Sequence, residues 1–284
     1  MNAISQHAMH TRPIPSSGQA LPVVGCGTYL GFDAGGSKAD RAPLGGVLEN
    51  LFAHGGSVID SSPMYGRAEG VVGDLLTAGN WHDRAFVATK VWTQGREAGI
   101  DQMRRSMELL QRKRIDLMQI HNLVDWRTHL ATLRAWKSEG LITYVGVTHY
   151  TSSAYPELES VLRAEKLDFV QLNYSLDDRK AEERLLPLAA DRGIAVLVNR
   201  PLGVGKLVHS LQRKPMPAWA PAMGCTGWAQ ILLKFVLAHP AVTCVIPGTG
   251  QPEHMKEDCL AGTGPFLDQK LCNQLRAFWD STGR

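Results

Sequence analysis

A chain of 284 residues is long enough for one α/β barrel, a fold that typically needs ~250 residues. Its 44% hydrophobic and 20% charged residues are ordinary for a globular enzyme with a sizeable core. The formal net charge is only +3 and the sequence has no basic run with interleaved aromatic residues, so we expect no nucleic acid partner.

The N-terminal residues 1–20 lack the apolar run of a secretion signal, and no stretch approaches the ~18 apolar residues of a membrane-spanning helix. We therefore expect a cytoplasmic protein without membrane contact, in which residues 1–20 form a partly flexible N-terminal extension. The five cysteines are odd in number and none lie in a C-x-x-C spacing, which predicts free thiols rather than disulfides or a zinc site.

Eight short apolar runs recur along the chain, separated by longer stretches with helical spacing. Such runs are typical of strands that are buried on both faces of a parallel sheet. The predicted strands are 23–27, 57–60, 86–90, 117–121, 144–148, 169–173, 195–199 and 244–247.

Apolar residues three and four apart predict helices between these strands, for example around 103–110, 130–136 and 228–235. Gly140 and Gly193 are placed to end helices just before the fifth and seventh strands. Eight strand–helix units predict a single (β/α)8 TIM barrel domain over residues 1–284. A doubly wound open sheet is the alternative, but no G-x-G-x-x-G follows the first strand.

The longest irregular stretch, residues 203–227, follows the seventh strand and contains three prolines. A long loop in a compact domain is usually functional, so we expect this segment to contribute to a binding site.

Charged residues close three successive predicted strands: Asp60, Lys90 and His121. The carboxyl ends of barrel strands form the active-site face, so these groups are expected to converge. Lys90 could pair with Asp60 and lower the pKa of nearby Tyr65, which could then donate a proton to a carbonyl oxygen. His121 could hydrogen-bond the same oxygen. A rim of solvated strand ends is the alternative interpretation.

Seven short motifs stand around these residues in a fixed order. They are Asp-Ser-Ser-Pro-Met-Tyr-Gly (60–66), Ala-Thr-Lys-Val-Trp (88–92), Gln-Ile-His (119–121), Gly-Val-Thr (146–148), Val-Gln-Leu-Asn-Tyr (170–174), Pro-Leu-Gly (201–203) and Ile-Pro-Gly-Thr (246–249). With this ordered set the sequence resembles the aldo-keto reductases. Its Arg-Pro-Ile-Pro-Ser-Ser-Gly start (12–18) and residues 121–136 are similar to bacterial members with poorly assigned substrates. The resemblance implies a monomeric barrel that uses NADPH or NADH, without a metal, to reduce an aldehyde or ketone to an alcohol or to catalyse the reverse reaction. It implies that the catalytic tetrad is Asp60, Tyr65, Lys90 and His121.

The resemblance also implies a cofactor-binding set. Its members are Gly27, Thr28, Asp60, Thr148, His149, Gln171, Asn199, Pro201, Leu202, Gly203, Gly248, Thr249, His254, Glu257 and Asp258. The chain departs from the family at two places, because Thr148-His149 replace the usual Ser-Asn and Asn199 replaces an aromatic residue. NADPH is favoured by the family pattern. Pro252 predicts a helix start whose free N–H groups could bind phosphate, with His254 supplying charge or lying exposed at the surface.

For the substrate pocket we nominate five apolar or aromatic residues, which would suit aromatic or alicyclic carbonyls. They are Tyr29, Met64, Trp92, Trp126 and Trp219. Ordinary packing is the alternative for each of them.

Two other functions remain open at this stage. The first is a cofactor-binding, redox-sensing regulatory subunit with little turnover, since relatives of this fold include such subunits. The second is a metal-dependent barrel hydrolase, which would need His and carboxylate ligands on several strands, whereas only His121 and Asp60 qualify.

Overall fold

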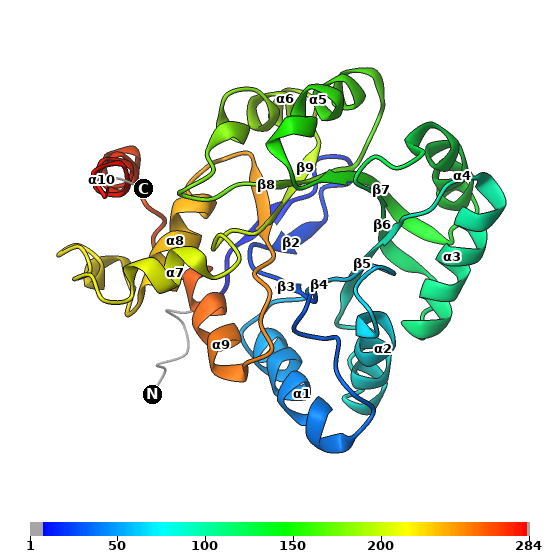
Figure 1. Ribbon diagram of the computed structural model, residues 1–284, viewed down its shortest axis with the longest axis horizontal. Helices are drawn as coiled ribbons and strands as arrows, with labels where there is room; N and C mark the ends of the chain where they lie inside the picture. The colour runs from blue at the N-terminus through cyan, green and yellow to red at the C-terminus, as the bar shows by residue number, and fades with distance from the viewer. Residues whose placement is uncertain (1–7, 283–284) are drawn as a thin grey trace.

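Eight parallel strands form the centre of the computed structural model, which describes residues 8–282. Strands that follow one another in the chain are neighbours in the sheet, and two isolated bridges, Val24 with Val245 and Gly27 with Gly248, join its edges. The sheet therefore curls into the TIM-barrel-like arrangement seen in Figure 1. Its strands are β3 (Cys26–Gly27), β4 (Val58–Asp60), β5 (Phe86–Val91), β6 (Ile115–His121), β7 (Ile142–His149), β8 (Phe169–Asn173), β9 (Ala195–Asn199) and β10 (Val242–Val245).

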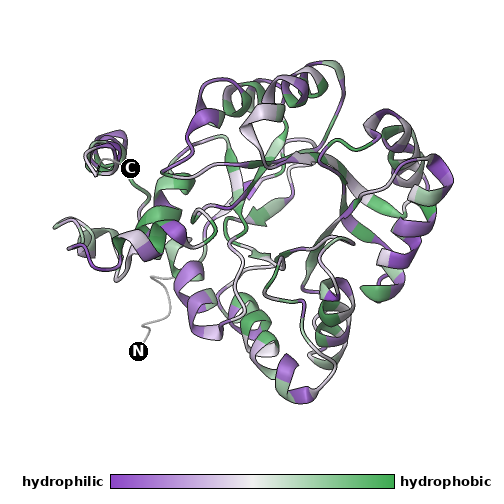
Figure 2. Ribbon diagram, viewed as in Figure 1, coloured by the Kyte–Doolittle hydropathy of each residue, from purple (hydrophilic) through white to green (hydrophobic). Residues whose placement is uncertain are grey.

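Helices surround the sheet, and their apolar residues face it while polar residues lie outside (Figure 2). The helices are α1 (Lys38–Ala53), α2 (Ala68–Ala78), α3 (Arg96–Leu109), α4 (Trp126–Ser138), α5 (Tyr155–Ala164), α6 (Leu185–Asp191), α7 (Lys206–Leu211), α8 (Trp228–Leu237), α9 (Pro252–Ala261) and α10 (Gln269–Asp280). Gly140 and Gly193, with φ of 77° and 62°, follow the ends of α4 and α6 and confirm the predicted helix ends. No helix within residues 8–282 has the length and apolar character needed to cross a membrane.

The segment after β9 is more ordered than the sequence predicted. Residues 203–227 contain α7 and a 3-10 turn, η3 (Pro221–Met223), because Leu207 and Leu211 are one helical turn apart and both are buried. Next to this segment lies α8, which is buried on nearly all sides. Beyond the helical ring α10 packs on α8, and Phe278 stacks on Trp228 with ring centroids 5.6 Å apart (Figure 1).

A hairpin closes the N-terminal end of the barrel. Strands β1 (Thr11–Pro13) and β2 (Ala20–Pro22) pair antiparallel, and the buried Ile14 and Leu21 pack among side chains from inside the barrel. Arg12 donates to the backbone carbonyls of Leu237 and His239. This part of the predicted extension is therefore folded, because its two apolar side chains have a core to enter.

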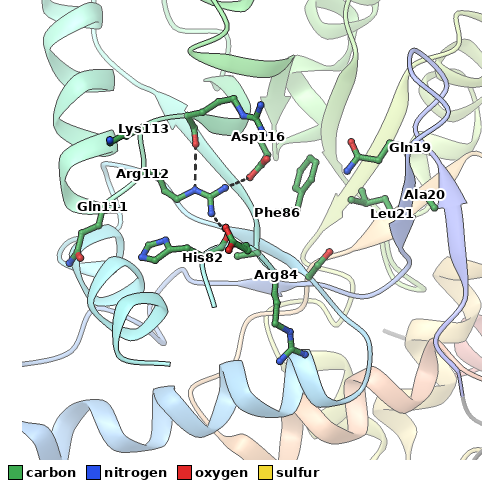
Figure 3. A pocket seen from close by; sticks show the side chains of 14 residues that line it. Gln19, Ala20, Leu21, His82, Arg84, Phe86, Gln111, Arg112, Lys113 and Asp116 are labelled. Carbon is green, nitrogen blue, oxygen red and sulfur yellow. Dashed lines mark hydrogen bonds and ion pairs between the residues drawn. The ribbon is translucent and has the colours of Figure 1, made fainter. Parts of the chain in front are cut away.

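A cavity of about 650 Å³ opens beside this hairpin and the start of β5 (Figure 3). Its central side chain is Arg112, which donates to the carbonyls of His82 and Arg114 and to Asp116 Oδ2 at 2.9 Å. Arg84 points away toward α1 and donates to the carbonyl of Phe52 at 2.9 Å. The chain itself thus supplies partners for both guanidinium groups.

Candidate active site

The strand register brings the predicted polar residues together at the carboxyl end of the barrel. Asp60 pairs with Gly27, and His121 pairs with Thr148, which in turn pairs with Gln171. The barrel fold places these strand ends around one opening, so residues far apart in the sequence share a single mouth.

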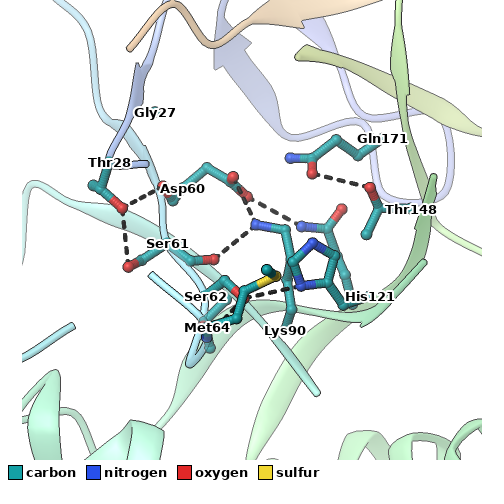
Figure 4. A network of polar contacts seen from close by, with 12 residues as sticks. Gly27, Thr28, Asp60, Ser61, Ser62, Met64, Lys90, His121, Thr148 and Gln171 are labelled. Atoms are coloured by element: carbon teal, nitrogen blue, oxygen red, sulfur yellow. Dashed lines mark hydrogen bonds and ion pairs between the residues drawn. The ribbon is translucent and has the colours of Figure 1, made fainter. Parts of the chain in front are cut away.

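The centre of this mouth is a buried ion pair between Lys90 and Asp60 (Figure 4). Lys90 Nζ lies 2.7 Å from Asp60 Oδ2 and donates to Ser61 O at 2.7 Å, and its side chain is 0% exposed. Gln119 Nε2 donates to Asp60 Oδ1 at 3.2 Å. Burial lowers the pKa of Lys90, but the interactions with Asp60 and Tyr65 together outweigh it, so the pKa lies above its ordinary value and the ammonium stays charged.

Tyr65 lies over this cation. Lys90 Nζ is 5.0 Å from the centroid of the Tyr65 ring, and the half-buried ring contacts those of Tyr29 and His121. Burial raises the pKa of Tyr65, and the opposing effect of Lys90 does not cancel it. The expected lowering of this pKa is therefore corrected: in this structure Tyr65 is a protonated phenol, which is the form that a proton donor needs.

His121 is held as a neutral imidazole. Burial and the nearby Lys90 lower its pKa to about 3. Ser62 Oγ lies 3.0 Å from His121 Nδ1 and accepts a hydrogen bond from Met64 N at 3.4 Å. When the Ser62 hydroxyl donates to Nδ1, Nε2–H of His121 is the donor toward the opening.

A cavity of about 670 Å³ occupies the mouth and is lined by Tyr65 and His121. Thirteen of the fifteen residues expected to bind cofactor line it as well. They are Gly27, Thr28, Asp60, Thr148, Gln171, Asn199, Pro201, Leu202, Gly248, Thr249, His254, Glu257 and Asp258. Gly203 is not part of this lining, although Val204 and Gly205 are, and neither is His149, whose Nδ1 instead accepts from Thr151 N at 3.2 Å.

Several residues that line this cavity have a buried polar atom without a partner. Gln171 Nε2, Asn199 Oδ1 and Asn122 Oδ1 are buried and make no hydrogen bond within the part of the chain that the structure describes. Thr148 Oγ1 donates to Gln171 Oε1 at 3.1 Å, which directs the amide nitrogen away from that oxygen. One donor and one acceptor, on the neighbouring strands β8 and β9, match the two ends of a carboxamide group. Unpaired buried groups of this kind favour a bound polar molecule.

The far end of the cavity meets the start of α9. Pro252 occupies the first turn and no side chain caps the helix, which confirms the predicted helix start and leaves N–H groups open to an anion. His254 and Arg200 add basic groups to the lining. Asp258 is 3% exposed, and burial raises its pKa to about 8.

The five nominated pocket residues divide into two groups. Tyr29 and Met64 line the cavity, whereas Trp92 is not part of its lining, although the Trp92 ring lies 6.3 Å from that of His121. Trp126 and Trp219 are half-buried against the hydrophobic core and do not belong to the cavity lining described here. Packing, the alternative interpretation, is what the structure shows for these last two residues.

Sequence reasoning missed Ser62, Asn122, Tyr150 and Arg200. Ser62 stands inside the motif between Asp60 and Tyr65, and Asn122 directly follows His121, so proximity to a predicted catalytic residue was an available signal. The Arg200 guanidinium lies over the Tyr150 ring, 4.1 Å from its centroid, and no pattern in the sequence indicates this pairing.

All five cysteines are buried and unpaired, which confirms the prediction of free thiols. Among residues 8–282, no group of three or more His, Cys, Asp and Glu side chains is arranged to hold a metal ion.

A parallel eight-stranded barrel with a Tyr–Lys–Asp–His mouth defines a class of oxidoreductases. The model of the aldo/keto reductase family matches residues 24–280, and the chain belongs to this family of NAD(P)H-dependent oxidoreductases. It is 26% identical to the uncharacterized oxidoreductase YqkF of Bacillus subtilis, over 95% of this chain and 96% of that protein. It is 28% identical to the NADH-specific methylglyoxal reductase of Escherichia coli, over 74% and 72% of the two chains.

A solved structure shows the same architecture. The aldo/keto reductase of Klebsiella pneumoniae in complex with NADP and acetate matches with a TM-score of 0.79 and 26% identity, over 96% of this chain and 95% of the other.

Proposed function

We propose that this protein reduces an aldehyde or ketone to an alcohol with a nicotinamide cofactor, or catalyses the reverse reaction, with Tyr65 as the proton donor. The observation that carries the proposal is the buried Lys90–Asp60 pair beneath Tyr65, at the wall of a cavity that also contains the neutral His121. Burying a cation costs free energy that its partner Asp60 offsets, and here the cation faces the phenol that would become negatively charged during proton donation.

Three residues of the mouth have separate roles in this reaction. Neutral His121 donates Nε2–H to the substrate carbonyl and orients it. Tyr65 donates its phenolic proton to the carbonyl oxygen, and Lys90 stabilises the resulting phenolate. When bound, the reduced cofactor would supply the hydride that the carbonyl carbon accepts.

The cavity fits such a cofactor. Gln171 Nε2 and Asn199 Oδ1 would hold the carboxamide, and the open start of α9 would bind phosphate. We favour NADPH, because the Klebsiella pneumoniae relative was solved with NADP and because His254 and Arg200 line the cavity. NADH stays possible, since the Escherichia coli relative is NADH-specific. We further expect a cytoplasmic monomer.

A regulatory subunit with little turnover finds no support in the relatives named above, which are an oxidoreductase and two reductases. Cofactor binding without oxidation by any carbonyl would be its signature.

The proposal is tested by titrating the protein with NADPH and NADH, following tryptophan fluorescence, and then adding a panel of aldehydes and ketones. We expect binding followed by cofactor oxidation. Tyr65→Phe removes the proton donor and should lower kcat by at least ~100-fold while cofactor binding is retained.

Tyr144→Phe is the matched control, because Tyr144 is a buried tyrosine whose hydroxyl donates to Gln19 at the opposite end of the barrel. This variant should keep wild-type turnover. A Tyr65→Phe protein with near-normal kcat would show that another group donates the proton.

A further inference from the structure

A buried carboxylate lies behind the wall of the barrel and takes no part in the proposed reaction. Glu69, in the first turn of α2, is 2% exposed. It accepts hydrogen bonds from Thr89 Oγ1 at 2.5 Å and from Ser106 Oγ at 3.1 Å, and both donors are buried. Thr89 belongs to β5 and Ser106 to α3. One carboxylate therefore joins α2 to a strand of the barrel and to the neighbouring helix.

The bond to the strand is made next to the lysine of the buried ion pair. Thr89 and Lys90 are consecutive in β5, and successive side chains in a strand point to opposite faces of the sheet. Lys90 points into the barrel, where it pairs with Asp60, whereas Thr89 points outward to Glu69. The hydrogen bond from Thr89 thus fixes α2 against the part of β5 that presents Lys90.

The other end of this connection lies next to the proposed proton donor. Tyr65 is in the turn that leads into α2, and its carbonyl oxygen accepts from the N–H of Ala68, the first residue of the helix, at 3.2 Å. Further along α2, Gly73 packs so closely on α3 that a side chain there would collide with the backbone of Leu109. The start of α2 and the Tyr65 backbone are therefore held together, and a shift of α2 relative to β5 would move Tyr65 relative to Lys90.

We propose that Glu69 is a positioning residue, which sets the distance between the Tyr65 phenol and the Lys90 ammonium by accepting the hydrogen bond from Thr89. Lys90 Nζ lies 5.0 Å from the Tyr65 ring centroid, and the attraction between a cation and a phenolate weakens as their distance grows. Glu69 acts only through these neighbours, because it does not line the cavity of the mouth. This inference rests on the proposed carbonyl reduction and adds to it a residue outside the mouth.

The test removes one hydroxyl donor at a time, because replacing Glu69 itself would leave two buried hydroxyl groups without their acceptor and destabilise the fold. Thr89→Val removes the donor on β5 and keeps a β-branched side chain, whereas Thr89→Ser keeps the hydroxyl. Ser106→Ala is the matched control, because it removes the donor on α3 and leaves Thr89 bound to Glu69.

The quantity measured is the single-turnover rate of NADPH oxidation at saturating cofactor, with a carbonyl that the wild type reduces. We expect Thr89→Val to lower this rate about ten-fold, while the Kd of NADPH from tryptophan fluorescence stays within about two-fold of wild type. Thr89→Ser and Ser106→Ala should keep the rate within about three-fold of wild type. Thr89→Val and Ser106→Ala should lower the midpoint of urea unfolding by similar amounts, since each removes one donor from the same carboxylate.

The comparison between variants separates positioning from stability. A rate in Thr89→Val as high as in Ser106→Ala would show that Glu69 only stabilises the fold, and would overturn the inference while carbonyl reduction stands. A loss of rate that is equally large in Thr89→Ser would also overturn it, because the hydroxyl would then not be the cause. If the wild type oxidises neither NADPH nor NADH with any carbonyl of the panel, the proposed function fails and the inference falls with it.

Discussion

The two ends of the barrel contain cavities of nearly equal volume, about 650 Å³ and 670 Å³. They differ in whether the polar side chains around them have hydrogen-bond partners. At the N-terminal end Arg112 is paired with two carbonyls and Asp116. At the mouth Gln171, Asn199 and Asn122 each present an unpaired amide atom. Of the buried side-chain atoms around the N-terminal cavity that are described, only His82 Nδ1 is left unpaired.

The comparison teaches that cavity size alone does not mark a binding site. Folding normally pairs buried polar groups, so the unpaired amide atoms distinguish the side chains of the mouth from those of the N-terminal cavity. The ion pairs differ in the same way. Arg112 and Asp116 pair within one stretch of chain and bind the backbone of His82 and Val87, whereas Lys90 and Asp60 lie beneath Tyr65. Substitutions at the mouth should therefore lower turnover, whereas substitutions at the N-terminal end should lower only stability.

The largest effect is expected for Lys90→Met. The change leaves Asp60 buried without its cation, which should lower the free energy of unfolding by about 3–5 kcal/mol. It also removes the charge beneath Tyr65, so kcat should fall at least ~100-fold. Urea unfolding and cofactor oxidation measure the two effects.

Lys234→Met is the matched control, because Lys234 is equally buried but donates only to the carbonyls of Thr263 and Pro265. It should lose about 1–3 kcal/mol of stability and retain turnover. Comparable losses of kcat in both lysine variants would contradict a specific role for Lys90.

Arg112→Met should separate stability from activity at the other end. Asp116 loses its cation and two carbonyls lose a donor. The pair is largely but not fully buried, at 14% and 16% exposure, so we expect the free energy of unfolding to fall by about 2–3 kcal/mol. The kcat/KM of the folded protein should stay within about two-fold of wild type. A strong loss of kcat/KM would show that the N-terminal cavity also contributes to function.

Asp258→Asn should have an effect of the opposite sign, on stability alone. The folded pKa of about 8 lies above the ordinary value for Asp, so the folded state holds a proton that the unfolded state releases. The contribution of this group to stability is therefore lost as the pH rises from ~4 to 8. Asparagine cannot ionise, so the variant should be more stable than wild type at pH 8, with little difference near pH 4.

Glu253→Gln, at an exposed position in the first turn of the same helix, is the control and should show no such pH dependence. Urea unfolding at the two pH values measures both variants. A stabilisation by Asp258→Asn that is equal at both pH values would contradict the raised pKa.

Residues at strand ends were predictable from the sequence alone. Asp60, Lys90 and His121 follow apolar runs, and parallel strands bring such positions to one face. Trp126 and Trp219 were predicted to line the pocket, but both pack against the core. The sequence cannot separate these outcomes, because an aromatic residue in a loop or first helical turn can do either. The N-terminal hairpin also escaped prediction, since its strands are only three residues long and become stable by packing Ile14 and Leu21 into the barrel.

The alternation of strands and helices and the chemical identity of the mouth follow from the amino-acid sequence, because both depend on local periodicity and on which residue closes each strand. The protonation of Tyr65 and His121 follows from the folded structure, since those pKa values depend on burial and on Lys90. The same is true of the amides that are left unpaired. Burial and pairing are properties of atoms brought together across the barrel, and no sequence spacing encodes them.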